Sequence, residues 1–83
     1  MIDRLENYRP PASRAELEDR YAAGERCFPQ TDLSDADLSG IQLNGADFEK
    51  HSWFHNANFS GASLRGASFR ECNVKCVDFS NAD

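Results

Sequence analysis

The residues best suited to chemistry in this 83-residue chain include three carboxylates, Asp32, Asp35 and Asp37, which lie within six positions of one another. Carboxylates at this density bind Ca²⁺ or take part in acid–base chemistry. Asp also suits outward and corner positions, because its side chain hydrogen-bonds to its own backbone. We favour solvated positions for these three residues and predict neither a metal site nor a catalytic site.

A second group of candidates lies in the stretch Lys50-His51-Ser52-Trp53-Phe54-His55. Exposed Trp is enriched at binding hot spots, so Trp53, His55, His51 and Lys50 form a candidate partner-binding surface. The alternative is that Trp53 covers a local bulge, or lies under the N-terminal arm, and only fills space. Two His residues without a third ligand or an acidic orienting residue are a weak basis for a metal site, so we expect no metal or cofactor.

The three cysteines, Cys27, Cys72 and Cys76, are odd in number and lack the C-x-x-C spacing of redox and zinc sites. Cys72 falls on a small inward position of the pattern described below, where it would behave as a small hydrophobic residue. Reduced thiols in a reducing compartment are the simplest interpretation. We therefore expect a cytoplasmic location.

The remaining composition excludes several function classes. We find no Ser/His/Asp set and no glycine-rich phosphate loop, so we predict that the protein is not an enzyme. The net charge of −5 argues against direct nucleic-acid binding through phosphate neutralisation. The chain has no apolar run long enough for a signal peptide or a membrane span.

A period of five residues organises about two thirds of the chain, and the stretch A-N-F-S-G-A-S-L-R-G-A at residues 57–67 shows it best. Each unit reads small, polar, large, polar, and often Gly. Five residues advance about 500° round an α-helix, so they make no single stripe, and an odd period alternates faces in a flat strand. The pattern therefore needs a backbone that turns once per unit, with the last two residues at the corner.

The large residue of each unit is its centre and is predicted to point into a core. The spacing is regular except between Phe48 and Phe54, where six residues separate two centres. One residue is therefore extra, and His51 is the expected one, within a bulge. After an entry unit at Phe28, the predicted core centres are Leu33, Leu38, Leu43, Phe48, Phe54, Phe59, Leu64, Phe69, Val74 and Phe79.

The corner glycines indicate how many units complete one turn. Gly40 and Gly45 recur 21 residues later as Gly61 and Gly66, which is four units plus the extra residue. Four corners of about 90° close a square. The centres should then stack in four columns, namely Phe28–Phe48–Phe69, Leu33–Phe54–Val74, Leu38–Phe59–Phe79 and Leu43–Leu64.

The units Ala36-Asp37-Leu38-Ser39-Gly40 and Ala57-Asn58-Phe59-Ser60-Gly61 resemble the A-(D/N)-L-X-X motif of pentapeptide repeat proteins. The resemblance covers residues 28–83. It implies an all-β solenoid, a right-handed quadrilateral β-helix of slightly under three coils, with a short N-terminal α-helical cap. It implies little about function, although the best-studied members resemble duplex DNA and bind DNA gyrase. The expected organisation is an arm and capping helix over 1–27 and a β-helix over 28–83.

The capping helix is predicted over Ser13–Ala23. Ser13 and Glu16 fit the S-x-x-E capping box, and Gly24 suits the left-handed residue after the last turn. Leu17 and Tyr21 lie four residues apart on one face, which should cover the open top of the first coil at Leu33, Leu38 and Leu43. The preceding arm, residues 1–12, either packs on this helix or is mobile.

The last coil is predicted to present an open edge after Phe79, where either a second copy pairs or a longer protein continues. We expect a non-enzymatic scaffold or protein-binding module that engages another protein through a lateral face or this edge, and a homodimer through the edge is an option. The alternative is a DNA-mimicking gyrase modulator acting as a stacked dimer. Residues 28–83 carry eight acidic and four basic side chains, a net charge of −4. This is about half the charge of duplex DNA of equal length, which disfavours a single chain as a mimic.

Overall fold

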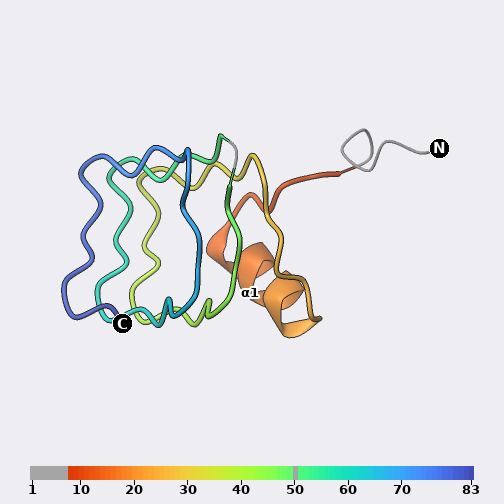
Figure 1. The fold of residues 1–83 in the computed structure, drawn as a ribbon, viewed down its shortest axis with the longest axis horizontal. Helices are drawn as coiled ribbons and strands as arrows, with labels where there is room; N and C mark the ends of the chain where they lie inside the picture. The colour runs from red at the N-terminus through yellow and green to blue at the C-terminus, as the bar shows by residue number, and fades with distance from the viewer. Residues whose placement is uncertain (1–7, 50) are drawn as a thin grey trace.

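The computed structural model describes residues 8–49 and 51–83. One helix, α1 (Arg14–Ala22), precedes a chain that winds into a stack of coils. In Figure 1, α1 lies at one end of the stack and the C-terminal coil lies at the other. Lys50 and the first seven residues lie outside the described part, and with them the expected contribution of Lys50 to a binding surface.

Parallel backbone bridges join successive coils and set their register. Cys27 pairs with Asp47, 20 residues later, whereas Asp37 pairs with Asn58, 21 residues later. The separation is 21 wherever a pair spans residues 49–51 and 20 elsewhere, so the extra residue lies in that stretch. The bridged residues precede the predicted centres, and the four columns expected from the glycine spacing are confirmed: Cys27–Asp47–Ser68, Asp32–Trp53–Asn73, Asp37–Asn58–Asp78 and Gln42–Ser63.

The corners depend on a left-handed residue directly before the small inward residue of the next unit. Gly40 has a φ of 70°, and Asp35, which lacks the freedom of glycine, has a φ of 65°. His51 adopts the same conformation with a φ of 71°. Glu49 also has a regular place, because its N–H donates to Asp47 Oδ1 at 2.9 Å as in the other turns. His51 therefore holds a regular corner position, which corrects the expectation that it is the extra residue.

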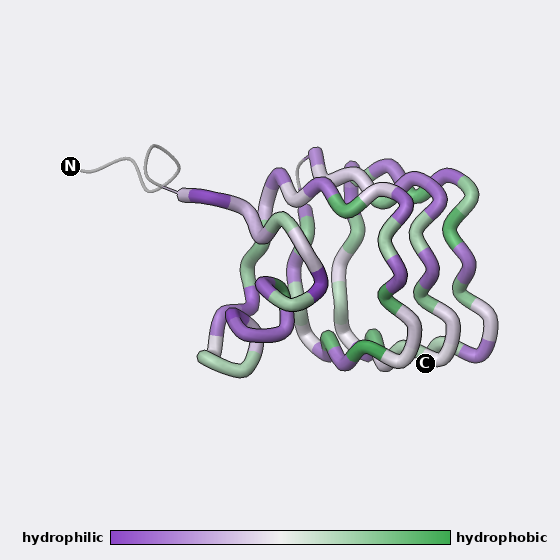
Figure 2. The backbone as a smooth tube through the Cα atoms, turned by 180° about the vertical axis from the view of Figure 1, so that it is seen from behind, coloured by the Kyte–Doolittle hydropathy of each residue, from purple (hydrophilic) through white to green (hydrophobic). Residues whose placement is uncertain are grey.

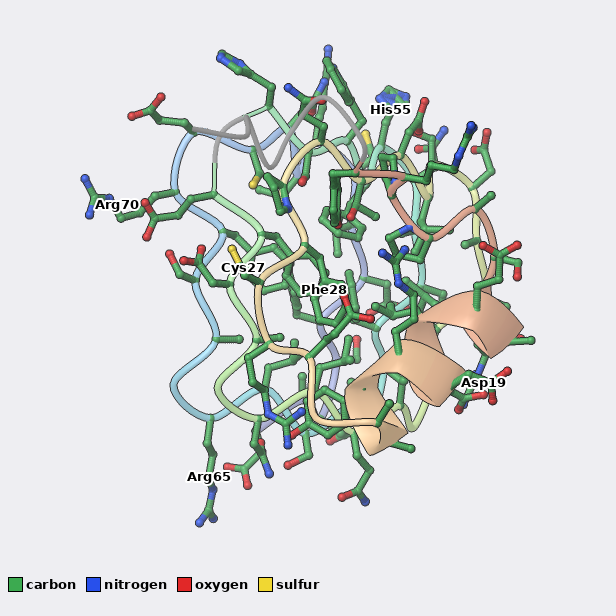
Figure 3. The ribbon with its side chains drawn as sticks, turned by 90° about the vertical axis from the view of Figure 1, so that its right-hand side faces the viewer. Asp19, Cys27, Phe28, His55, Arg65 and Arg70 are labelled. Carbon is green, nitrogen blue, oxygen red and sulfur yellow. The ribbon has the colours of Figure 1, made fainter. Side chains whose placement is uncertain are left out.

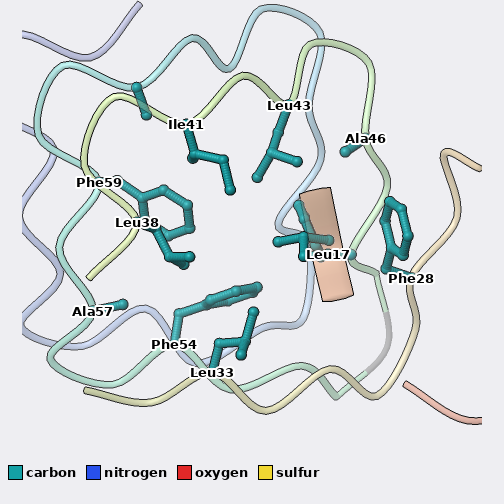
Figure 4. Close-up of a cluster of buried hydrophobic side chains, with 12 residues drawn as sticks. Leu17, Phe28, Leu33, Leu38, Ile41, Leu43, Ala46, Phe54, Ala57 and Phe59 are labelled. Atoms are coloured by element: carbon teal, nitrogen blue, oxygen red, sulfur yellow. The ribbon is translucent and has the colours of Figure 1, made fainter. Parts of the chain in front are cut away.

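The centres fill the interior with stacked rings and leucines (Figure 4). Phe48 lies between Phe28 and Phe69, with ring centroids 5.6 and 5.2 Å apart. This arrangement excludes water from the middle of the stack, where side chains such as Phe54 are fully buried. The alternation of apolar and polar residues along each coil is visible in Figure 2.

Helix α1 begins one residue after the predicted start, with Ser13 as its N-cap, and its last residue is Ala22. The Ser13 hydroxyl accepts the Glu16 N–H at 3.2 Å, as predicted. The prediction of the other capping-box bond is wrong, because Glu16 Oε1 accepts the N–H of Ala12 and not that of Ser13. The helix is followed by Gly24 at a φ of 105°, as expected for a residue past the C-terminus.

The described end of the arm packs on α1. The Arg20 guanidinium lies 5.3 Å from the Tyr8 ring centroid and donates to the carbonyl of Arg9 at 2.6 Å. Pro11 is fully buried. The arm is expected either to pack on the helix or to be mobile, and residues 8–11 pack on it.

Candidate functional site

The lateral face around Trp53 presents part of the candidate surface that the sequence indicates. Trp53 is 44% exposed and stands in the column between Asp32 and Asn73. His55 follows on the same rung and is half-buried, and it is labelled at the upper edge of Figure 3. His51 is exposed at the preceding corner. The structure thus brings Trp53 and His55 to one face and places His51 beside it.

The aspartates of the first coil bond to their own turns. Asp32 Oδ1 accepts the N–H of Ser34 at 3.2 Å. Asp37 Oδ1 accepts the N–H of Ser39 at 3.1 Å and its hydroxyl at 2.7 Å. Both bonds lower the pKa of the Asp37 carboxyl, and the bond from the Ser39 hydroxyl has the larger effect. Within residues 8–49 and 51–83, no group of three or more His, Cys, Asp or Glu residues is arranged to hold a metal ion.

One lateral face repeats this turn in every coil. Below Asp37, Asn58 accepts the N–H of Ser60 at 2.9 Å, and Asp78 accepts the N–H and hydroxyl of Ser80 at 2.8 and 2.6 Å. The Ser80 hydroxyl and N–H lower the pKa of Asp78 as well. An amide thus separates two ionised carboxylates, so this face carries only two negative charges along its column.

The cysteines take three different environments. Cys72 is half-buried, and its thiol contacts the carbonyl oxygen of Phe48 at 2.7 Å. Burial raises the pKa of this thiol, which opposes formation of a reactive thiolate. Cys27 and Cys76 are exposed, and all three are free. Cys72 thus packs against the core as the small inward residue expected, and its thiol also contacts a backbone carbonyl.

Helix α1 closes the N-terminal edge of the stack. Leu17, fully buried, belongs to the same apolar cluster as Leu33, Leu38 and Leu43, as the lid prediction requires. Figure 3 shows the helix lying over this end. The N-terminal lid is thus a packed part of the core.

Two side chains of this lid also bond to the coil's free carbonyl groups. Arg14 Nη1 donates to the carbonyls of Ser39 at 2.9 Å and Asp37 at 3.3 Å. The Tyr21 hydroxyl donates to the carbonyl of Asn44 at 2.7 Å. Sequence reasoning missed these contacts, because no local motif tells which distant carbonyl a side chain reaches.

The corresponding carbonyls of the next coil show what Arg14 and Tyr21 replace. There, the carbonyls of Asn58, Ser60 and Arg65 accept backbone N–H groups from the coil above, at 2.7 to 2.9 Å. Arg14 and Tyr21 therefore supply side-chain donors where an additional coil would supply main-chain donors.

The opposite edge of the stack has no such cover among the described residues. Phe79 is 40% exposed and Val74 is 36% exposed, although both are core centres. The backbone groups directed to a following coil have no protein partner in the described part of the chain. They are the N–H groups of Gly66, Phe69, Glu71, Val74, Cys76, Phe79 and Asn81 and the carbonyls of Ala67, Cys72, Val77 and Ala82.

Stacked four-sided coils of five-residue units, closed by a helix at one end, define a β-helix solenoid. The family model for pentapeptide repeats matches residues 28–50 and 54–83 in eight copies, so the chain belongs to the pentapeptide repeat family.

The chain is also similar in structure to alr5209, a pentapeptide repeat protein from Nostoc Pcc 7120, with a TM-score of 0.59. The identity is 23% over 90% of this chain and 78% of the other, which supports the fold alone. No curated protein matches the sequence. Among the described residues, no helix has the length and apolar character needed to cross a membrane.

Proposed function

We propose that this 83-residue chain is a non-enzymatic interaction module that binds another protein through the open edge of its last coil. The observation that carries the proposal is the exposure of Phe79 and Val74, two core centres. The centres of the other two coils are buried, apart from the half-buried Leu64. Covering Phe79 and Val74 on binding removes apolar surface from water.

The chemistry of the edge defines the partner. The exposed centres lie among unpaired N–H groups, which outnumber the unpaired carbonyls of the same coil by seven to four. A matching partner presents an apolar surface together with main-chain carbonyl groups, as the exposed edge of a β-structure does. The last coil carries Arg70 and Lys75 but also Glu71 and Asp78, so its charge selects neither an acidic nor a basic rim on the partner.

A second candidate surface is the lateral face at Trp53 and His55, supported by the exposed indole. Aromatic side chains of this kind anchor many protein interfaces. This face would bind a partner along the side of the solenoid, away from the open edge. The cytoplasm is the proposed location for either function, since the cysteines are free.

One experiment separates these surfaces. Val74→Glu places a charge on the open edge, and Trp53→Ala removes the lateral anchor. Proteins captured from the native host by the parent chain should be lost with Val74→Glu and kept with Trp53→Ala. Circular dichroism establishes that both variants keep the fold. Capture that survives Val74→Glu and is lost with Trp53→Ala would transfer the function to the lateral face, and capture unchanged by both would contradict both proposals.

The homodimer and the gyrase-directed DNA mimic expected from the sequence use the same edge. A stacked pair would double the length of the rod, but the column of Asp37 and Asp78 holds its two charges two coils apart, or about 9.6 Å. Duplex DNA carries a charge every ~1.7 Å along its axis. We therefore rank this alternative second. Unchanged supercoiling by gyrase at high protein concentration would eliminate it.

A further inference from the structure

The two ends of the solenoid have opposite hydrogen-bonding character. On each face, the coil nearer the N-terminus donates two N–H groups to the next coil and accepts one N–H from it. On one face these bonds are Leu38 N–H to Asn58 O, Gly40 N–H to Ser60 O and Asn58 N–H to Ala36 O. An edge after the last coil therefore has two donors and one acceptor per face. An edge before the first coil has one donor and two acceptors per face.

These ends are complementary to each other in one chain. The donors of Val74, Phe79 and their corner residues face outward at the C-terminal edge, and the carbonyls of Asp37, Ser39 and Asn44 face outward at the N-terminal edge. The columns also continue, because Phe28, Leu33 and Leu38 begin the columns that Phe69, Val74 and Phe79 end. A second copy stacked head to tail would satisfy the backbone groups of both edges.

A symmetric pair of C-terminal edges would not satisfy them. Each edge brings seven unpaired N–H groups and four carbonyls from the described residues, so two edges bring fourteen donors and eight acceptors. At least six of the fourteen donors would be buried without a carbonyl partner, which is unfavourable. The head-to-tail arrangement is thus the one that the backbone of this chain supports.

We propose that α1 is a gate that prevents head-to-tail assembly, because it occupies the N-terminal edge where the C-terminal edge of a second copy would otherwise bind. Arg14 and Tyr21 hold three of the carbonyls that such a copy needs, and Leu17 covers the apolar centres of the first coil. The inference rests on the proposed function in one respect, since both require the open edge to bind a protein. Displacing α1 exposes a heterologous interface that propagates without closing.

The corner residues provide a reporter of this arrangement. Asp35 and Cys76 occupy the same corner column in the first and third coils, with Asn56 between them. They are two rungs apart within one chain, which is about 9.6 Å and too far for a disulfide. In a head-to-tail stack, position 35 of one copy lies one rung, about 4.8 Å, from Cys76 of the next, within reach of a disulfide.

The reporter chain carries Cys27→Ser and Asp35→Cys, so that the exposed Cys27 forms no other cross-links. The matched control carries Cys27→Ser and Gln30→Cys. Gln30 has a φ of 58°, close to the 65° of Asp35, and is equally exposed, but it belongs to a different corner column. Both chains are oxidised at several concentrations and separated by non-reducing electrophoresis.

Releasing the gate should produce a ladder. We expect the reporter with intact α1 to remain largely monomeric. Adding Arg14→Ala and Tyr21→Phe, which removes the three bonds to the coil carbonyls, should raise cross-linked dimers, trimers and larger products at least about tenfold. Circular dichroism checks the fold. Tyr21→Phe alone keeps the ring and removes one bond, so it should give a smaller increase and serves if the double substitution unfolds the chain.

Three results would overturn the gate. They are an unchanged pattern on release in a chain that stays folded, equal ladders from the Gln30→Cys control, and products that stop at dimers, which would indicate symmetric pairing. The outcome is separable from the proposed function. A Val74→Glu-sensitive protein partner without a ladder rejects the gate alone, whereas a ladder without such a partner rejects the proposed function alone.

Discussion

At the scale of single residues, the depth of a centre within the stack should determine its contribution to stability. Phe59 and Phe79 share one column with parallel rings 5.6 Å apart, but Phe59 is fully buried and Phe79 is 40% exposed. Phe59→Ala should reduce the free energy of unfolding by about 3–5 kcal/mol because it leaves a cavity, and Phe79→Ala by about half of that or less. Urea denaturation measures both, and equal losses would show that the last coil is covered in solution.

The acidic turns predict a pH dependence at the same scale. The folded-state pKa of Asp37 is below its unfolded value because the Ser39 hydroxyl and N–H donate to it. Its contribution to stability is therefore fully present above the unfolded pKa, about 3.9, and is lost as pH falls through the folded pKa. Ser39→Ala removes the hydroxyl bond and should raise the Asp37 pKa in a carboxyl NMR titration. Ser60→Ala, beside the uncharged Asn58, is the control and should leave it unchanged.

At the scale of the elements, Leu17 should supply the apolar part of the docking of α1, beside the hydrogen bonds of Arg14 and Tyr21. Leu17 is the buried residue of α1, and it packs in the core cluster of the first coil. We expect Leu17→Ala to lower the free energy of unfolding by about 2–5 kcal/mol. Glu18→Ala, which removes only an exposed pair with Arg14, should change it by less than about 0.5 kcal/mol. Denaturation of the two variants tests this, and similar values would mean that α1 is not docked.

The elements also show what a sequence of this kind predicts and what it does not. A period of five forces the backbone to turn, and the recurrence of Gly40 at Gly61 is enough to place the four columns. The start of α1 follows from a local cap at Ser13. The reach of Arg14 to carbonyls 23 and 25 residues away depends on packing between distant segments. The binding surfaces stay predictions, because exposure of Trp53 does not identify a partner.

At the scale of the whole molecule, the unequal ends should produce a gradient of local stability. Each coil contacts only its neighbours, so a coil with one free edge is held less firmly than one between a lid and another coil. The amides of Leu38 and Phe59 offer a matched pair in one column, bonded to Asn58 O at 2.7 Å and Asp78 O at 2.8 Å.

Opening of the last coil breaks the second of these bonds but leaves the first intact, so hydrogen exchange at Phe59 should be at least about tenfold faster than at Leu38. Native-state exchange followed by NMR measures the difference. Equal rates for the two amides would mean that the chain opens as one cooperative unit. In that case the open edge would be as firmly structured as the capped end, and a partner would bind a surface that is already formed.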